Sequence, residues 1–256
     1  VFSNGFTQSG GQADDVNNVE RIKIASGTLS NSGQWLVKVM HRGGTSQAFG
    51  LVMSTKATPN PMADYTTFDT NVSATKRQFR LLIKHIADYA SIGLHPSYYT
   101  MKNSAMLKKE KERLESITNI PTTISRQHFL RFSLPETYQN LIDLEINEDY
   151  SMGYASHVGF RAGTSIPFHF FDLDFEIQTP LLIYPFALMD TTLNDYMGLT
   201  PKQSLGRTKD LLHEVMKVKG TFITLFHNES VSGYLRWNGW QRVYETMLKM
   251  IRKNAY

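Results

Sequence analysis

The stretch Ile92-Gly93-Leu94-His95-Pro96-Ser97-Tyr98-Tyr99 decides the fold that we expect for this chain. Its apolar beginning is typical of a short buried strand, and Pro96 ends that strand because proline has no amide hydrogen to donate to a neighbour. His95 is therefore predicted at the carboxyl end of a strand, the end that carries the chemistry in barrels of alternating strands and helices. A single histidine is as easily a hydrogen-bonded loop residue, so the prediction depends on whether the pattern recurs.

Short apolar runs alternate with helical patterns along most of the chain. The predicted strands cover 47–53, 92–95, 122–128, 181–188 and 221–226. The predicted helices cover 35–40, 73–90, 102–118, 134–141, 200–220 and 237–251. This alternation predicts an α/β fold with a mainly parallel sheet and right-handed connections.

The predicted strands and one extended segment, 144–154, end in polar side chains: His95, Arg126 with His128, Asp149, Asp190 and His227. Closing the sheet into a barrel would bring these ends to one rim. An open, doubly wound sheet would spread them along an edge, but the chain has no glycine-rich phosphate-binding motif to support that fold.

Composition excludes several kinds of function. The chain has 256 residues, a formal charge of +4 and no cysteine. Its charges are mixed in sign along the sequence, so we expect no nucleic-acid partner. Without cysteine, only His, Asp and Glu remain as candidate metal ligands. No apolar run is long enough to span a membrane and no signal peptide is visible, which slightly favours a cytoplasmic location.

The first 34 residues differ from the rest because they are rich in Gly, Ser, Gln and Asn. Residues 1–34 are predicted to be an irregular lead-in, and residues 35–256 a single domain. Within that domain, 58–69 is predicted to be a surface loop because it contains Pro59 and Pro61.

Five segments together resemble one known family. The motifs are GLHPSYY at 93–99, SRQH at 125–128, DYSMGY at 149–154, GFRAGT at 159–164 and HN at 227–228. In this order they resemble a bacterial branch of the polysaccharide deacetylases, carbohydrate esterase family four with its NodB-homology domain. The resemblance runs from about Trp35 to the C-terminus. It implies a distorted (β/α)7-type barrel and metal-dependent removal of acetyl groups from sugars.

The resemblance also implies roles for single residues. His95 matches the first metal-binding histidine of the family, whereas the second is expected where this chain has Tyr99. We conjecture that His128 takes its place. His227 matches the late histidine that protonates the departing amine, a task suited to an ordinary histidine pKa of about 6.5.

Other matched residues orient the site or contact the substrate. Arg126 and Asp149 match positions that orient the catalytic base and the histidine, respectively. Arg161 either contacts the substrate or braces its own loop. Tyr98, Tyr99 and Trp237 are candidate surfaces for stacking against a sugar, although each is equally compatible with ordinary packing.

The chain departs from the family at its start, where an Asp-rich motif at the end of the first strand supplies the base and a metal ligand. Asp14-Asp15 is the only early candidate that we identify from the sequence, and no apolar strand precedes it. The first strand is therefore expected to be missing or degenerate.

Two kinds of function follow from this sequence. One is a hydrolase that removes N- or O-acetyl groups from a polysaccharide or a sugar precursor with a divalent metal, zinc being the expected ion. The alternative is an inactive carbohydrate-binding relic of the same fold, or a truncated chain that lacks the first catalytic motif. The sequence gives neither the sugar nor the oligomeric state.

Overall fold

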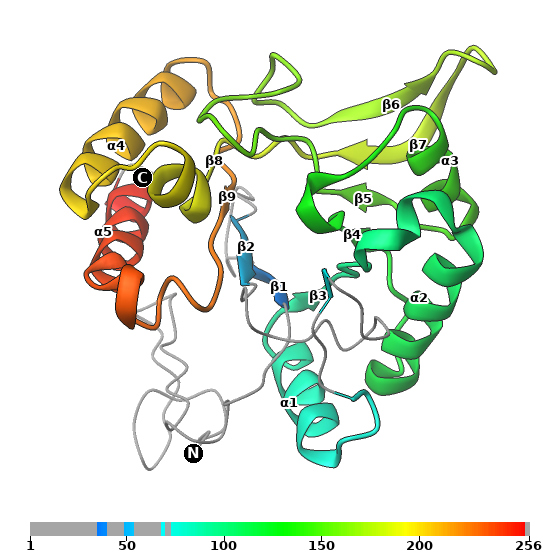
Figure 1. Cartoon of the computed structure of the whole chain (residues 1–256). Coiled ribbons are helices and arrows are strands. Elements are labelled where there is room, and N and C mark those ends of the chain that lie inside the picture. Colours follow the sequence, from blue (N-terminus) through cyan, green and yellow to red (C-terminus); the bar gives the residue numbers. More distant parts are fainter. Residues whose placement is uncertain (1–34, 40–48, 54–67, 70–72, 254–256) are drawn as a thin grey trace.

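The computed structural model describes residues 35–39, 49–53, 68–69 and 73–253 (Figure 1). The predicted lead-in over 1–34 lies outside the described residues, as does Asp14-Asp15. Among the described residues, no helix is both long and apolar enough to cross a membrane.

The strands form two sheets. The first has the order β3-β1-β2-β9-β8, with bounds Ser91–Ile92, Trp35–Val39, Phe49–Met53, Thr224–Leu225 and Leu188–Met189. The second has the order β4-β5-β7-β6, with bounds Ile124–Ser125, Glu148–Asp149, Ile177–Ile183 and Phe168–Asp172. Strand β1 is antiparallel to both of its neighbours and β6 is antiparallel to β7, whereas the other pairs are parallel.

Two connections join the sheets. Leu94, just after β3, forms a parallel bridge with Ser125, and the Leu94 amide donates to the Ile124 carbonyl at 2.7 Å. On the other side, the chain passes from β7 directly into β8, and the Ala187 amide donates to the Ile223 carbonyl at 2.8 Å. The predicted α/β class is confirmed. The predicted single barrel is not what the described strands form, because they pair as two sheets.

Five α-helices flank these sheets (Figure 1). Their bounds are α1 Arg77–Ala87, α2 Ser104–Thr118, α3 Glu136–Asp143, α4 Pro201–Lys217 and α5 Trp240–Lys253. All five lie within or close to predicted helices. Helix α4 begins as its sequence indicates, with a capping box between Thr200 and Gln203 and with Pro201 in the first turn.

Two local predictions are corrected. The run Trp35–Met40 was predicted as a helix, but Trp35–Val39 is strand β1. A run of six apolar residues fits either structure, and its β-branched Val37 and Val39 favour a strand. Strand β6 was not predicted at all, although Phe170 is buried between the exposed side chains of His169 and Phe171.

Large apolar side chains form three core clusters, one of which contains Ile124 of β4 and Leu225 of β9 and so joins the two sheets. One core cluster lies between helices α1, α2 and α3 and strand β7, with Ile83, Leu114 and Leu181 at its centre. Another packs α4 and α5 against β8 and includes Trp237 and Trp240. Burial of this apolar surface is the main favourable contribution to folding.

Gly153 is predicted to be intolerant of any side chain. A Cβ atom added there would lie 2.2 Å from ring atoms of Phe186, whose side chain is only 1% exposed. We expect Gly153→Ala to lower the free energy of unfolding by about 3 kcal/mol, because a packed ring must move. Urea denaturation measures the change. Gly206→Ala is the control, since nothing lies within 4 Å of a Cβ at that exposed helical position, and a stabilisation of up to about 1 kcal/mol is expected. Equal stability of Gly153→Ala and wild type would contradict the prediction.

Candidate functional site

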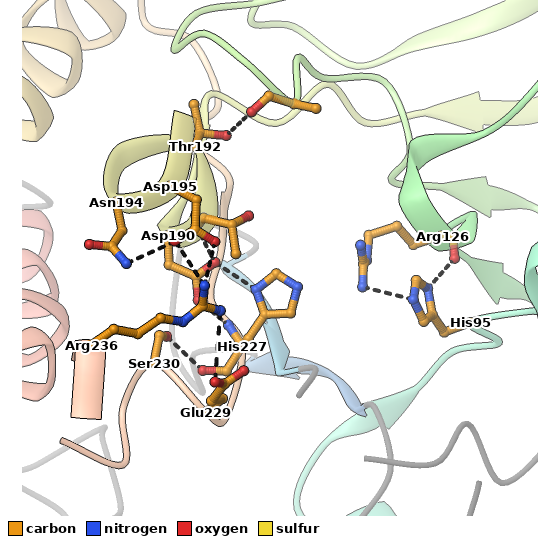
Figure 2. Close-up of polar contacts among 12 residues, drawn as sticks. His95, Arg126, Asp190, Thr192, Asn194, Asp195, His227, Glu229, Ser230 and Arg236 are labelled. Carbon is orange, nitrogen blue, oxygen red and sulfur yellow. Dashed lines mark hydrogen bonds and ion pairs between the residues drawn. The ribbon is translucent and has the colours of Figure 1, made fainter. Parts of the chain in front are cut away.

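The predicted polar residues lie at or just after the ends of strands. His95 follows the Leu94 bridge, Arg126 follows β4, Asp190 follows β8 and His227 lies two residues after β9. Figure 2 shows the His227 ring and the Arg126 guanidinium on facing sides, pointing toward one another. The charge of His227 contributes to lowering the pKa of both His95 and His128, so the three rings lie near one another.

His227 is held by a buried carboxylate. Its Nδ1 lies 2.6 Å from Oδ1 of Asp190, and its amide donates to Oδ2 at 2.5 Å. Asp190 is fully buried. Burial raises the pKa of Asp190, but the contacts with His227 outweigh this effect and hold the pKa below its usual range. An ionised Asp190 keeps the His227 proton on Nδ1 and leaves Nε2 to exchange protons with a substrate.

A second histidine–carboxylate pair lies beside His95, whose ring centroid is 5.0 Å from that of His128. Nδ1 of His128 is 2.9 Å from Oδ1 of Asp69, and Asp69 is 1% exposed. The Tyr98 amide also donates to Asp69, at 3.0 Å to Oδ1 and 3.2 Å to Oδ2. Burial lowers the pKa of His128 although Asp69 opposes the change, so the ring is neutral at neutral pH.

Asp69 is a candidate site residue that the sequence does not single out, because Pro59 and Pro61 make 58–69 resemble a surface loop. The signal was present, since the β-prone run Tyr65-Thr66-Thr67-Phe68 is directly followed by an aspartate. The same rule that singled out His95 therefore applies to Asp69. The site therefore contains a buried carboxylate from a segment that precedes His95 in the chain, although the sequence predicts that the first Asp-bearing strand is missing or degenerate.

His95 and Arg126 lie together on the side of the site that faces His227. Nδ1 of His95 lies 2.5 Å from the Arg126 carbonyl, and Nε2 lies 3.3 Å from Nη2 of Arg126. Burial and the charges of Arg126 and His128 lower the pKa of His95 well below its usual range. Burial lowers the pKa of Arg126 to about 9, against the charges of Asp190 and Asp149. Its Nε is buried and has no hydrogen-bond partner.

The predicted metal ligands do not converge on one point. The ring centroids of His95 and His128 are 5.0 Å apart, and two imidazoles with a carboxylate are a common ligand set for divalent metals. However, Nδ1 of His128 faces Asp69, and Nε2 of His95 faces a guanidinium cation. In the part of the chain that the structure describes, no three His, Asp or Glu side chains could hold a metal ion. This arrangement does not fit a three-ligand site, and zinc dependence stays a prediction.

Asp149 does not make the contact that we predicted. It is fully buried and accepts hydrogen bonds from Ser125 Oγ at 2.7 Å, from Ser151 Oγ at 2.9 Å and from the Ser151 amide at 2.9 Å. Burial raises its pKa, and these hydrogen bonds oppose the increase. The carboxylate that orients His227 is Asp190. Asp149 instead joins the ends of β4 and β5 near Arg126.

Two of the predicted substrate-binding residues belong to a cluster of rings beside the site. We call Phe68, Tyr98, Tyr99 and Phe129 the aromatic group. The Phe68 ring stacks on Tyr98 with centroids 4.2 Å apart, and the Phe129 ring lies 4.6 Å from His128. Tyr99 and Phe129 are 46% and 59% exposed, so both side chains are accessible from solvent. Aromatic faces of this kind can stack against a sugar.

The other two predicted substrate-binding residues lie elsewhere. The Arg161 guanidinium lies 4.5 Å from the Phe132 ring centroid, which corresponds to the bracing alternative. Trp237 is 1% exposed and packs edge to face on Trp240 with centroids 5.4 Å apart. The prediction of Trp237 as a stacking surface is wrong, because the ring belongs to the core beneath α5.

One more carboxylate is buried near the site. Glu110 of α2 is 2% exposed and accepts two hydrogen bonds from Ser97, and burial raises its pKa to about 7. Asp69 adds to this increase and Arg113 opposes it.

The raised pKa of Glu110 predicts a specific pH dependence of stability. Between the ordinary pKa of 4.5 and about 7, the folded chain keeps a proton that the unfolded chain loses. The free energy of unfolding therefore falls as the pH rises through this window, by on the order of 3 kcal/mol from this group. Glu110→Gln should remove that decrease, whereas Glu112→Gln, on the exposed side of α2, should retain it. Urea denaturation at pH 5 and pH 8 measures both. Equal pH dependence in wild type and Glu110→Gln would rule out the raised pKa.

Comparisons with known proteins agree with the fold. No protein-family model matches the chain, and no curated protein matches it. A crystal structure described as "putative polysaccharide deacetylase from Mycobacterium smegmatis" is similar, with a TM-score of 0.52 and 14% sequence identity. The match covers 71% of this chain and 63% of that chain, so the chain spans less than two thirds of the matched protein. At this identity the likeness supports the fold alone. The chain is thus similar in fold to a protein described as belonging to the family that its motifs resemble.

Proposed function

We propose that this chain is a carbohydrate deacetylase, a hydrolase that removes N- or O-acetyl groups from a polysaccharide or a sugar precursor. One observation carries the proposal. The pair His227–Asp190 and a second pair, His128–Asp69, both lie near the buried Arg126. Two histidines held in this way supply an acid and a base on opposite sides of a scissile bond, as amide or ester hydrolysis requires. The likeness in fold and the motif resemblance support the same class of reaction.

The proposed reaction uses the chain's own residues. His128 takes a proton from water at Nε2, while Asp69 stabilises the resulting imidazolium. The water oxygen bonds to the acetyl carbon and the carbonyl electrons move onto oxygen, which the Arg126 guanidinium stabilises. The carbon–nitrogen bond then breaks, and His227 donates a proton to the departing amine. The products are acetate and the free amino sugar, or an alcohol when the acetyl group is on oxygen.

The predicted metal is a separate question. Zinc, held by His95 and His128, would polarise the acetyl carbonyl. The described side chains do not bring a third ligand to these two, so no step above depends on a metal.

Acetate release tests the proposal. The purified chain is incubated with N-acetylchitotetraose and with acetylated xylan, after EDTA treatment and again with added zinc or cobalt. We expect acetate from at least one substrate, and none from His227→Ala. Release only with metal would establish the predicted metal dependence. Absence of acetate under every condition would reject the proposed reaction for these two substrate classes.

The aromatic group favours one further candidate, a carbohydrate-binding protein without catalysis. Its exposed rings, those of Phe68, Tyr99 and Phe129, would bind a sugar whether or not the acid and base act. Calorimetric titration with the same two carbohydrates distinguishes the candidates. Binding without acetate release would favour the non-catalytic protein.

A further inference from the structure

The proposed reaction makes no use of Glu110, although its side chain is buried beside the site. Oε2 accepts the Ser97 amide hydrogen at 2.8 Å, and Oε1 accepts the Ser97 hydroxyl hydrogen at 2.6 Å. Both oxygens of the Glu110 carboxylate therefore bind Ser97, which lies two positions after His95. A carboxylate buried at this depth is unfavourable unless such hydrogen bonds compensate it.

The same turn is held by a second carboxylate. The next amide along the chain, that of Tyr98, donates to Asp69. Successive amides thus donate to Glu110 on one side and to Asp69 on the other. The Thr100 hydroxyl donates to the Ser97 carbonyl at 2.7 Å and closes the turn. The peptide between Ser97 and Tyr98 is therefore fixed by contacts from both of its ends.

This arrangement links α2 to the histidine–carboxylate pair. Asp69 accepts hydrogen bonds both from the Tyr98 amide and from Nδ1 of His128. A shift of the turn would move one of these two donors and change where Asp69 directs the His128 ring. Since Glu110 fixes the start of the turn, its contacts reach His128 through Tyr98 and Asp69.

We propose that Glu110 is a positioning residue, which fixes the turn after His95 and thereby the orientation of Asp69 and His128. Its kinetic consequence rests on the proposed deacetylase function. The ordering of the turn does not.

Glu110→Gln is the sharpest variant, because it keeps the shape of the side chain. A glutamine carbonyl can still accept the Ser97 amide hydrogen, but its NH₂ group can only donate to Ser97 Oγ. Above the Glu110 pKa of about 7, a charge-assisted hydrogen bond is thus replaced by a neutral one, which is about half as strong. Glu112→Gln, on the exposed side of the same helix, is the matched control.

Hydrogen–deuterium exchange of peptides covering 96–100 gives a readout independent of activity. We expect exchange there to be about tenfold faster in Glu110→Gln, a loss of about 1.4 kcal/mol. Peptides from α4 should be unchanged. In the acetate assay, kcat should fall about tenfold while KM stays within about twofold. Ser97→Ala should cause a smaller loss in Glu110→Gln than in wild type, because the charge-assisted contact with the Ser97 hydroxyl is already gone.

The outcomes separate the two proposals. Unchanged exchange over 96–100, or equally faster exchange in α4, would overturn the positioning role. Faster exchange confined to 96–100 with unchanged kcat would also overturn it, since the turn would then not influence the reaction. If the wild type releases no acetate, the proposed function fails, whereas the exchange experiment still decides whether Glu110 orders the turn.

Discussion

Replacing Asp190 by asparagine is expected to lower kcat for acetate release by about 10²- to 10⁴-fold, the range found when a catalytic histidine loses its carboxylate partner or its function. The carboxylate accepts from Nδ1 of His227 at 2.6 Å. The amide of asparagine can instead donate to Nδ1, which places the ring proton on Nε2. His227 would then have the wrong tautomer and could not be charged without losing a hydrogen bond.

The control for this change is Asp195→Asn. Asp195 lies on the short helix Thr192–Tyr196 after β8 and pairs with Arg236 at 3.0 Å, so it tests the loss of a nearby charge without touching His227. Its kcat should stay within about twofold of wild type, as expected for a partly exposed ion pair. Both variants are checked by thermal unfolding before kinetics. Equal kcat values for Asp190→Asn and Asp195→Asn would exclude His227–Asp190 as the acid.

Asp69→Asn is the second change with a large expected effect. The Asp69 contacts raise the pKa of His128 against its burial. Without the charge, that pKa should fall further and the imidazolium formed during the reaction should lose its partner. We expect kcat to fall by about 10²- to 10³-fold, as for removal of a general base.

The pH profile gives an independent readout of Asp69. A base acts only when it is unprotonated, so the rate decreases as the pH falls through the pKa of His128. Because Asp69→Asn lowers that pKa, this decrease should move to lower pH, and NMR titration of the His128 ring should show the same shift. Asp174→Asn, at an exposed position, is the control. An unchanged pKa of His128 would contradict the pairing.

The parts of the fold that were predictable are those with a strong local signal. The capping box at Thr200 and the apolar stripe of α1, with Phe79, Ile83 and Ile86 buried, are both readable from spacing alone. The strand-end histidines were also readable, since His95 and His227 each follow a short apolar run. These signals depend only on residues that are neighbours in sequence.

The rest depended on contacts between distant parts of the chain. Asp149 ends a short strand and Asp190 follows one, and only the arrangement of β8 beside β9 shows which of the two reaches His227. Trp237 has the kind of side chain that often stacks against sugars, and only its packing against Trp240 shows that it is buried. Asp69 was hidden for another reason, because Pro59 and Pro61 made its whole segment resemble a loop.

The short connection between β7 and β8 restricts insertions and deletions in this part of the chain. Residues 184–187 are all that separate the two strands, and Asp190 comes just after β8. A one-residue deletion there would draw Asp190 back by about 3.3 Å, the advance of one strand residue. That distance exceeds the 2.6 Å between Asp190 and His227, so the contact could not survive. Homologues that keep this pair should therefore show neither insertions nor deletions in this four-residue span.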